Sequence, residues 1–156
     1  MLPVMPVAVG EMAPDFVLKD QNNQDVRLSD FRARRPVLLV FYPLAFTGVC
    51  SSELRSLSSF AGAQVLTVSV DSVYAHKVWA LQEGFSVPLL ADFWPHGAVA
   101  SSYGVFNAAR GYAERGTFAV SLDGFVRFSE VVSASVTRSP AVWEAALASV
   151  SAPDDL

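Results

Sequence analysis

Residues 36–57 read PVLLVFYPLAFTGVCSSELRSL and contain both the longest apolar run of the chain and its only cysteine. Six consecutive apolar residues, 37–42, predict a central strand that is buried on both faces of a sheet. Pro43 has no backbone N–H and ends that strand, and Leu54, Leu57 and Ala61 then recur at helical spacing, with an end expected near Gly62. Cys50 is therefore expected in the first turn of a helix that follows the central strand.

The position of Cys50 allows two interpretations. A single free cysteine often only fills space in a core. The N-terminus of a helix, however, favours an anion and therefore a thiolate. Polar neighbours favour the second interpretation, and Pro43, Thr47 and Cys50 form the pattern Pro-x-x-x-Thr-x-x-Cys, which places a hydroxyl about one helical turn from the sulfur.

Composition limits the classes of partner. The chain has 156 residues, of which 52% are hydrophobic, and this length and composition indicate one globular domain over 1–156 with a substantial core. Its formal net charge is −4. No basic run is present, which argues against nucleic acid or an anionic membrane as the main partner. The apolar run 36–46 is too short for a bilayer, which needs ~20 residues. The N-terminus lacks a basic region and contains two early prolines, so a signal peptide is not expected and the cytoplasm is the expected compartment.

The remaining segments predict a mixed sheet. An N-terminal arm (1–10) precedes a hairpin of 16–19 and 25–28, and 65–70 is a second strand that makes a parallel crossover with the first. A helix capped by Asp71 or Ser72 and ended by Gly84 is expected to bury an apolar face, and Pro88 makes 88–90 an edge or irregular segment. The residues expected on that helix face are Tyr74, Val78, Leu81 and Phe85.

The C-terminal third predicts a hairpin and a helix. Residues 98–103 fit a short helix, and two alternating runs meet at Asp123 and Gly124, a strong hairpin signal. A last helix begins near Pro140, and the tail 151–156 is expected to be frayed. The residues that this helix is expected to bury are Val142, Trp143, Ala146, Leu147 and Val150. The result is an α/β fold with helices on both faces of a mixed central sheet and a site at the carboxyl ends of its strands.

The motifs resemble those of peroxiredoxins, which have a thioredoxin-like fold. The similarity covers most of the chain and is carried by APDFVL, FYPLAFTGVCSSEL, SVDS followed by His76 and Trp79, PLLADFWPHGAVASSYGVFN and RGTFAVS. Because FWPHGAV, YGVFN and RGTF occur and no second cysteine exists, the chain is most similar to the one-cysteine, alkyl hydroperoxide reductase E type. One departure is Ser121, where many members carry an acid; we expect it to affect the hairpin and not the chemistry.

The resemblance implies a thiol peroxidase that reduces hydrogen peroxide, organic hydroperoxides and peroxynitrite. It implies that Cys50 is the peroxidatic nucleophile, that Thr47 and Pro43 shape its pocket, and that Arg115 contacts both thiolate and peroxide. Glu53 and Val49 are expected to support the pocket. Without the resemblance, Arg115 would be interpreted as an ordinary surface arginine.

The chemistry requires a thiolate and donors for the charge that moves onto the leaving oxygen. The product is a sulfenic acid, and with one cysteine it needs an external thiol. That thiol is expected to be a small one such as mycothiol, followed by a glutaredoxin-like protein (mycoredoxin), or a thioredoxin. The resemblance also implies a homodimer, and neither a cofactor nor a metal ion is expected.

Two other functions compete with this one. A cysteine hydrolase would need a histidine base near Cys50, and only His76, placed off the apolar face of its helix, and His96 are available. A non-catalytic thioredoxin-like binding module would leave Cys50 an ordinary thiol. One cysteine and two distant histidines give no metal-ligand spacing, and the sequence lacks nucleotide-binding loops and a serine elbow.

Overall fold

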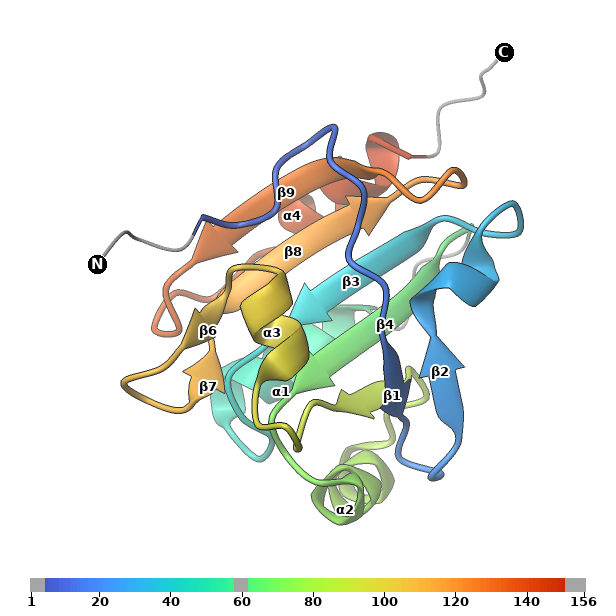
Figure 1. Cartoon of the computed structure of the whole chain (residues 1–156). Helices are drawn as coiled ribbons and strands as arrows, with labels where there is room; N and C mark the ends of the chain where they lie inside the picture. Colours follow the sequence, from blue (N-terminus) through green and yellow to red (C-terminus); the bar gives the residue numbers. More distant parts are fainter. Residues whose placement is uncertain (1–4, 58–61, 151–156) are drawn as a thin grey trace.

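One mixed sheet organises the molecule (Figure 1). The computed structural model describes residues 5–57 and 62–150, and within them seven strands pair in the order β2-β1-β5-β4-β3-β8-β9. Their bounds are β1 (Val17–Lys19), β2 (Asp25–Arg27), β3 (Val37–Phe41), β4 (Gln64–Ser69), β5 (Leu89–Ala91), β8 (Arg115–Val120) and β9 (Val126–Val132). A separate pair is formed by β6 (Phe106–Asn107) and β7 (Tyr112–Ala113). Strands β3, β4 and β5 are parallel and the outer pairs are antiparallel, which confirms the predicted mixed sheet.

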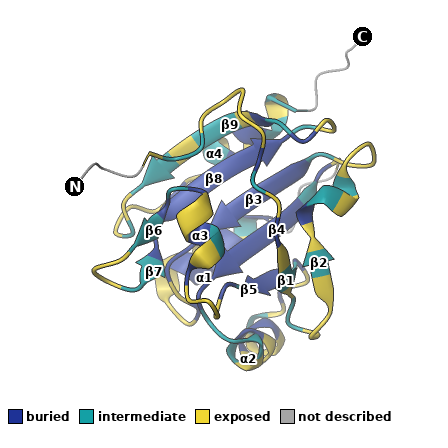
Figure 2. Cartoon of the chain, in the orientation of Figure 1, coloured by how far each residue is buried: buried dark blue, intermediate teal, exposed yellow. Residues whose placement is uncertain are grey.

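The predicted central strand is confirmed as β3. Each of its five residues is buried, and it pairs with β4 on one side and with β8 on the other. Figure 2 shows β3, β4, β5 and β8 as buried strands with exposed residues around them. Because β3 and β4 are parallel, their carboxyl ends lie at the same edge of the sheet, and the residues that follow them meet there.

Helices cover both faces of the sheet. Leu38 and Val40 of β3 pack with buried residues of α1 (Gly48–Leu57), α2 (Val73–Glu83) and α4 (Pro140–Ala148), whereas Leu39 and Phe41 pack on the other face against α3 (Ala98–Ser102) and its neighbours. The alternation of strand side chains therefore divides the core into two layers. A short 3₁₀ helix, η1 (Leu28–Phe31), precedes β3.

The turn and capping signals were accurate. Both predicted hairpins form, as β1–β2 and β8–β9, and Ser121 lies in the second turn, where its hydroxyl donates to the Phe125 carbonyl at 3.1 Å. The Ser72 hydroxyl caps α2 by accepting from the Ala75 N–H, and Gly84 ends that helix at a φ of 75°. Three predicted segments lie outside the described residues: the last turn of the Cys50 helix with Ala61, the first residues of the arm (1–4) and the tail 151–156.

The predicted buried face of α2 was wrong for three of its four residues; the fourth, Phe85, is buried just after the end of the helix. Tyr74, Val78 and Leu81 are 84%, 57% and 73% exposed, and the helix instead buries His76, Trp79 and Ala80. Both faces of this helix are apolar, so periodicity alone did not distinguish them. The prediction placed His76 on the exposed face of the helix. His76 is instead completely buried, where it forms hydrogen bonds with Ser69 and Tyr42.

The prediction of an edge or irregular segment at 88–90 was also wrong. Strand β5 lies inside the sheet, between β1 and β4. Pro88 precedes the strand, so its missing N–H is not needed, and its carbonyl accepts hydrogen bonds from both the backbone and the hydroxyl of Thr67.

Candidate active site

Cys50 lies where the sequence predicted it. It is the third residue of α1, which follows β3 after the loop 42–47, and the thiol is free and completely buried. Pro43, the residue that interrupts the strand, is buried in that loop. The sulfur therefore lies at the carboxyl edge of the sheet, in the first turn of α1. The unpaired backbone N–H groups of a first helical turn favour an anion.

Arg115 contacts the sulfur directly. It is the first residue of β8, and the pairing of Val40 with Thr117 brings it to the edge where β3 ends. Its Nη1 lies 3.3 Å from Cys50 Sγ and 2.5 Å from Glu53 Oε1, and its Nε donates to the Ala134 carbonyl at 2.9 Å. The side chain is 3% exposed, so its charge acts on the sulfur with little screening by water.

Glu53 connects this arginine to a second one. It lies one helical turn after Cys50 on α1 and is 1% exposed. Its Oε2 accepts from the backbone N–H and the Nε of Arg138 at 2.8 and 3.0 Å, and its Oε1 accepts from Arg138 Nη2 at 2.9 Å. The carboxylate therefore orients Arg115 while it is itself fixed by Arg138.

Sequence reasoning missed Arg138. Its guanidinium is buried, donates to the carbonyls of Phe41 and Gly116 and to the Thr117 hydroxyl, and lies 5.1 Å from the centre of the Trp143 ring. Burial lowers its pKa, and the bonds to Glu53 oppose that shift. One signal in the sequence was available. Arg138 lies just before the predicted start of the last helix, where a positive charge is unfavourable, and this indicates that its side chain binds an acidic partner in another part of the fold.

The four side chains, which we call the Cys50 cluster (Cys50, Glu53, Arg115 and Arg138), carry an excess of positive charge. Two guanidinium groups, which remain protonated in proteins, face one carboxylate. A buried charge without a partner is strongly unfavourable, and a thiolate at Cys50 is the anion that would balance the second cation. The geometry therefore places the sulfur beside an excess of buried positive charge, an observation that is independent of any motif.

The other predicted pocket residues lie close in sequence but do not bond the sulfur. The Thr47 hydroxyl is exposed and donates to the Leu44 carbonyl at 3.1 Å, and Val49 is 37% exposed. Among the described residues, the hydrogen bond to Cys50 Sγ comes from Arg115 and not from Thr47. Rotation about one side-chain bond would be needed to turn the Thr47 hydroxyl toward another acceptor.

Comparison with known proteins identifies the family. Residues 9–129 match the model of the AhpC/TSA family. The chain is 48% identical over 150 residues to alkyl hydroperoxide reductase E of Mycobacterium tuberculosis, covering 92% of this chain and 98% of that protein. This chain is a peroxiredoxin of the AhpC/TSA family.

More distant relatives agree with this assignment. Peroxiredoxin-2 of Cricetulus griseus is 37% identical over 147 residues, which cover 84% of this peroxiredoxin and 73% of the relative. The crystal structure of peroxidoxin BcpB from Mycobacterium tuberculosis superposes with a TM-score of 0.79 at 31% identity, covering 92% of this chain and 96% of the other. The peroxiredoxin is a thiol peroxidase, and its single cysteine is consistent with the one-cysteine type. The thioredoxin-like fold is confirmed.

Neither histidine is placed as a base for Cys50. His76 Nε2 bonds the Ser69 hydroxyl at 2.7 Å, and His96 Nε2 lies 2.7 Å from the Gly111 carbonyl. In the described part of the peroxiredoxin, no group of three metal-ligating side chains is found, and every described helix is too short or too polar to traverse a bilayer.

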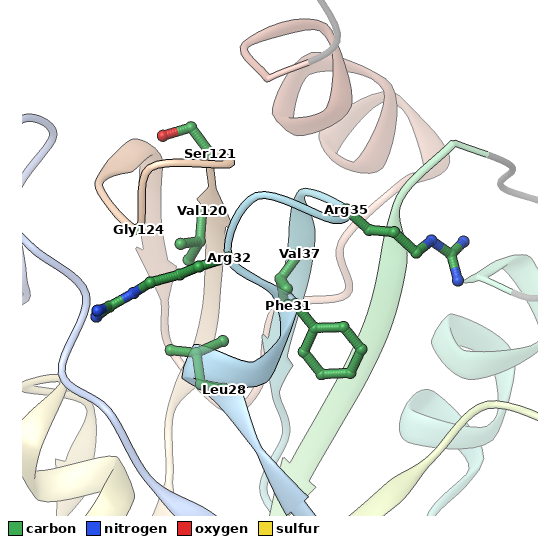
Figure 3. A pocket seen from close by; sticks show the side chains of 8 residues that line it. All are labelled: Leu28, Phe31, Arg32, Arg35, Val37, Val120, Ser121 and Gly124. Atoms are coloured by element: carbon green, nitrogen blue, oxygen red, sulfur yellow. The ribbon is translucent and has the colours of Figure 1, made fainter.

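Two hollows differ in their suitability for a ligand. A hollow of about 240 Å³ is lined by Arg110, Tyr112 and Ala134, among others. The Ala134 carbonyl accepts a hydrogen bond from Arg115, and the same guanidinium contacts Cys50 Sγ, so Arg115 connects the wall of this hollow to the sulfur. The pocket in Figure 3 lies at the start of β3 and the end of β8, between Leu28, Arg32 and Ser121. Its volume of about 10 Å³ is close to the minimum for one water molecule.

Two aromatic residues that follow β5 lie at the surface beside a third hollow. Phe93 and Trp94 are 53% and 81% exposed and help to line a hollow of about 540 Å³, whereas Tyr103 is fully buried.

Proposed function

We propose that this peroxiredoxin reduces hydrogen peroxide, organic hydroperoxides and peroxynitrite through Cys50. The observation that carries the proposal is the contact of 3.3 Å between Arg115 Nη1 and Cys50 Sγ inside a buried cluster with excess positive charge. The thiolate attacks one peroxide oxygen, the O–O bond breaks, and sulfur loses two electrons and gains that oxygen. With hydrogen peroxide or an organic hydroperoxide the other oxygen leaves as hydroxide or alkoxide and takes up a proton, which gives a sulfenic acid and water or an alcohol; with peroxynitrite the leaving group is nitrite.

Each residue of the site has a separate role in this proposal. Arg115 stabilises the thiolate and then the charge on the leaving oxygen, because its planar group offers several donors at once. Glu53 orients Arg115 through the bond of 2.5 Å. The Thr47 hydroxyl turns from Leu44 to the bound peroxide, while Pro43 and Val49 form the walls that exclude water.

An external thiol completes the cycle in this proposal. The chain has one cysteine, so the sulfenic acid cannot form an internal disulfide. A small thiol such as mycothiol with a glutaredoxin-like mycoredoxin, or a thioredoxin, reduces it. The reaction needs a supply of reduced thiol, which supports the cytoplasm as the compartment.

Intact mass spectrometry tests the reaction. One equivalent of peroxide is expected to add one oxygen to the reduced protein, and a small thiol is expected to reverse the gain. Cys50→Ser is the matched control and gains nothing. A sulfur that stays unmodified, while a reference peroxiredoxin in the same buffer is oxidised, contradicts the proposal.

We also propose that the chain is a single domain over 1–156 and forms a homodimer. The support for the homodimer is the exposed stripe Tyr74, Val78 and Leu81 on α2. Phe46, in the loop before α1, is also 52% exposed. Exposed apolar patches of this kind mark interaction sites. Sedimentation is expected to show a dimer that Val78→Asp dissociates. Val9→Asp, at a site with nearly the same exposure, is the control and is expected to remain dimeric.

A further inference from the structure

A buried polar network links α2 to the loop that precedes Cys50. The backbone N–H of Ala45 in that loop donates to Asp71 Oδ2 at 2.8 Å. Asp71 follows β4 by two residues, and because β3 and β4 are parallel, it lies at the edge where the loop leaves β3. Figure 1 shows the arrowheads of β3 and β4 at that same edge. The sheet topology therefore brings the carboxylate to the loop across a separation of 26 residues.

The Asp71 carboxylate is itself oriented by Ser69 and His76. The Ser69 hydroxyl lies 2.6 Å from Asp71 Oδ2 and 2.7 Å from His76 Nε2, and His76 Nε2 is also 3.3 Å from the Tyr42 hydroxyl and 3.8 Å from Asp71 Oδ2. An ionised carboxylate only accepts hydrogen bonds, so the proton of Ser69 points to Asp71. Ser69 must then accept from His76, which assigns the Nε2–H tautomer to the histidine.

The other ring nitrogen of His76 does not join the network. In the part of the chain that the structure describes, His76 Nδ1 is buried and makes no hydrogen bond of standard geometry, so Nε2 is the ring nitrogen that bonds Ser69. Burial lowers the pKa of His76 to about 4, so the ring is neutral near neutral pH. The network thus has one direction of donation, from His76 to Ser69 to Asp71, and it presents a fixed charged acceptor to Ala45.

The loop that receives this anchor has an unfavourable backbone conformation. Phe46 has a φ of 66°, in the left-handed region that non-glycine residues rarely adopt. Its ring packs 6.1 Å from Trp79, and the next residue, Thr47, precedes α1 directly. If the Ala45 bond were lost, Phe46 would be free to return to an ordinary conformation, and this would displace the first turn of the helix with Cys50.

We propose that Asp71 is a positioning residue of the peroxidase site, whose carboxylate, oriented by Ser69 and His76, fixes the loop 43–47 and with it the sulfur. This inference rests on the proposed function, because its consequence is the rate at which Cys50 reacts with peroxide. Asp71 is not a member of the Cys50 cluster, and its effect passes through the backbone of Ala45. Alignment of sulfur with the O–O bond is sensitive to small displacements.

The test compares Asp71→Ala, Asp71→Asn and Asp92→Ala. Asp92 is the matched control: it also follows a parallel strand and accepts two backbone N–H groups, but these belong to Val99 and Ala100 of α3. Stopped-flow oxidation of the reduced proteins by hydrogen peroxide is expected to slow roughly 10–100-fold in Asp71→Ala. Asp71→Asn is expected to recover most of the rate, because its side-chain oxygen can still accept from Ala45. Asp92→Ala is expected to react like the wild type.

A second readout is specific to the proposed contact. The amide of Ala45, followed by NMR, is expected to lose its protection from hydrogen exchange in Asp71→Ala and to keep it in Asp71→Asn. An Asp71→Ala protein that reacts at the wild-type rate, or an Asp71→Asn protein as slow as Asp71→Ala, overturns the proposal. If Asp71→Ala does not fold, Ser69→Ala decides in its place: a partial loss of rate supports the proposal, and a wild-type rate overturns it. Wild-type protein that fails to react with peroxide would instead overturn the proposed function.

Discussion

Replacing Arg115 by alanine should slow peroxide reduction about 10²–10³-fold, as the loss of one preorganised donor to a developing anion typically does. The structure indicates that the fold survives the change. Glu53 keeps its three hydrogen bonds from Arg138, so no buried carboxylate is left without a cation. The lost contacts are those of Arg115 with Cys50 Sγ, Glu53 and the Ala134 carbonyl.

This loss exceeds what ionisation of the sulfur can explain. An ordinary thiol with a pKa of ~8.5 is about 3% ionised at neutral pH, so complete ionisation increases the rate at most ~30-fold. The remainder must come from stabilisation of the leaving oxygen. Part of the deficit of Arg115→Ala should therefore disappear in alkaline buffer, where any thiol is ionised, and roughly 3–30-fold should persist.

Single-turnover stopped-flow oxidation from neutral to alkaline pH measures both parts of the deficit. Arg127→Ala is the matched control, because this arginine is 41% exposed on β9 and pairs with Asp123 on the hairpin. It should react like the wild type. If the Arg115→Ala deficit vanishes completely at alkaline pH, Arg115 serves only to ionise the sulfur, and the assignment to the leaving oxygen is refuted.

Three further predictions concern the surroundings of the sulfur. Thr47→Val should slow the same reaction about 10²–10³-fold and Thr47→Ser should not; equal rates for the two would remove the hydroxyl from the mechanism. Glu53→Gln should lower the free energy of unfolding, measured in urea, by ~3–5 kcal/mol, because it leaves two buried cations without a carboxylate. The control Glu83→Gln breaks the ion pair with Arg55 near the surface and should change the free energy of unfolding by less than ~1 kcal/mol. The pKa of His76 is lowered from 6.5 to about 4, so the unfolded chain binds the proton more readily, and stability should fall by about 3 kcal/mol as the pH drops from 6.5 to 4. His76→Gln should flatten that part of the pH profile, and an unchanged slope would show that other groups cause it.

The strand and helix around Cys50 were predictable because their signals are local. Six apolar residues, a proline and a helical repeat are enough to place β3, the loop and α1, and Asp123 with Gly124 is enough to place the β8–β9 turn. Arg115 was different. Its contact with Cys50 depends on strand pairing across 65 residues, and only the family resemblance suggested it.

The network of Glu53 and Arg138 shows why the rest of the site could not be predicted. These residues are separated by 85 positions, and each is of a type that is usually exposed. The sequence contains no periodicity that brings them together, because the contact arises from α1 and the segment before α4 packing on the same face of the sheet. The error on α2 has the same origin: the partner that buries His76 is Ser69, on another element.

The charge balance of the Cys50 cluster connects the two halves of the catalytic cycle. With a thiolate at Cys50, two buried cations face two anions, and the cluster is neutral. Oxidation to a sulfenic acid removes the charge from sulfur and leaves one guanidinium without a balancing anion in a place where water screens it little. In the proposed mechanism, that excess charge attracts an incoming thiolate to the oxidised sulfur. Arg115 and Arg138, to which the proposal gives the stabilisation of the nucleophile in the first step, would then also favour the approach of the reductant in the second.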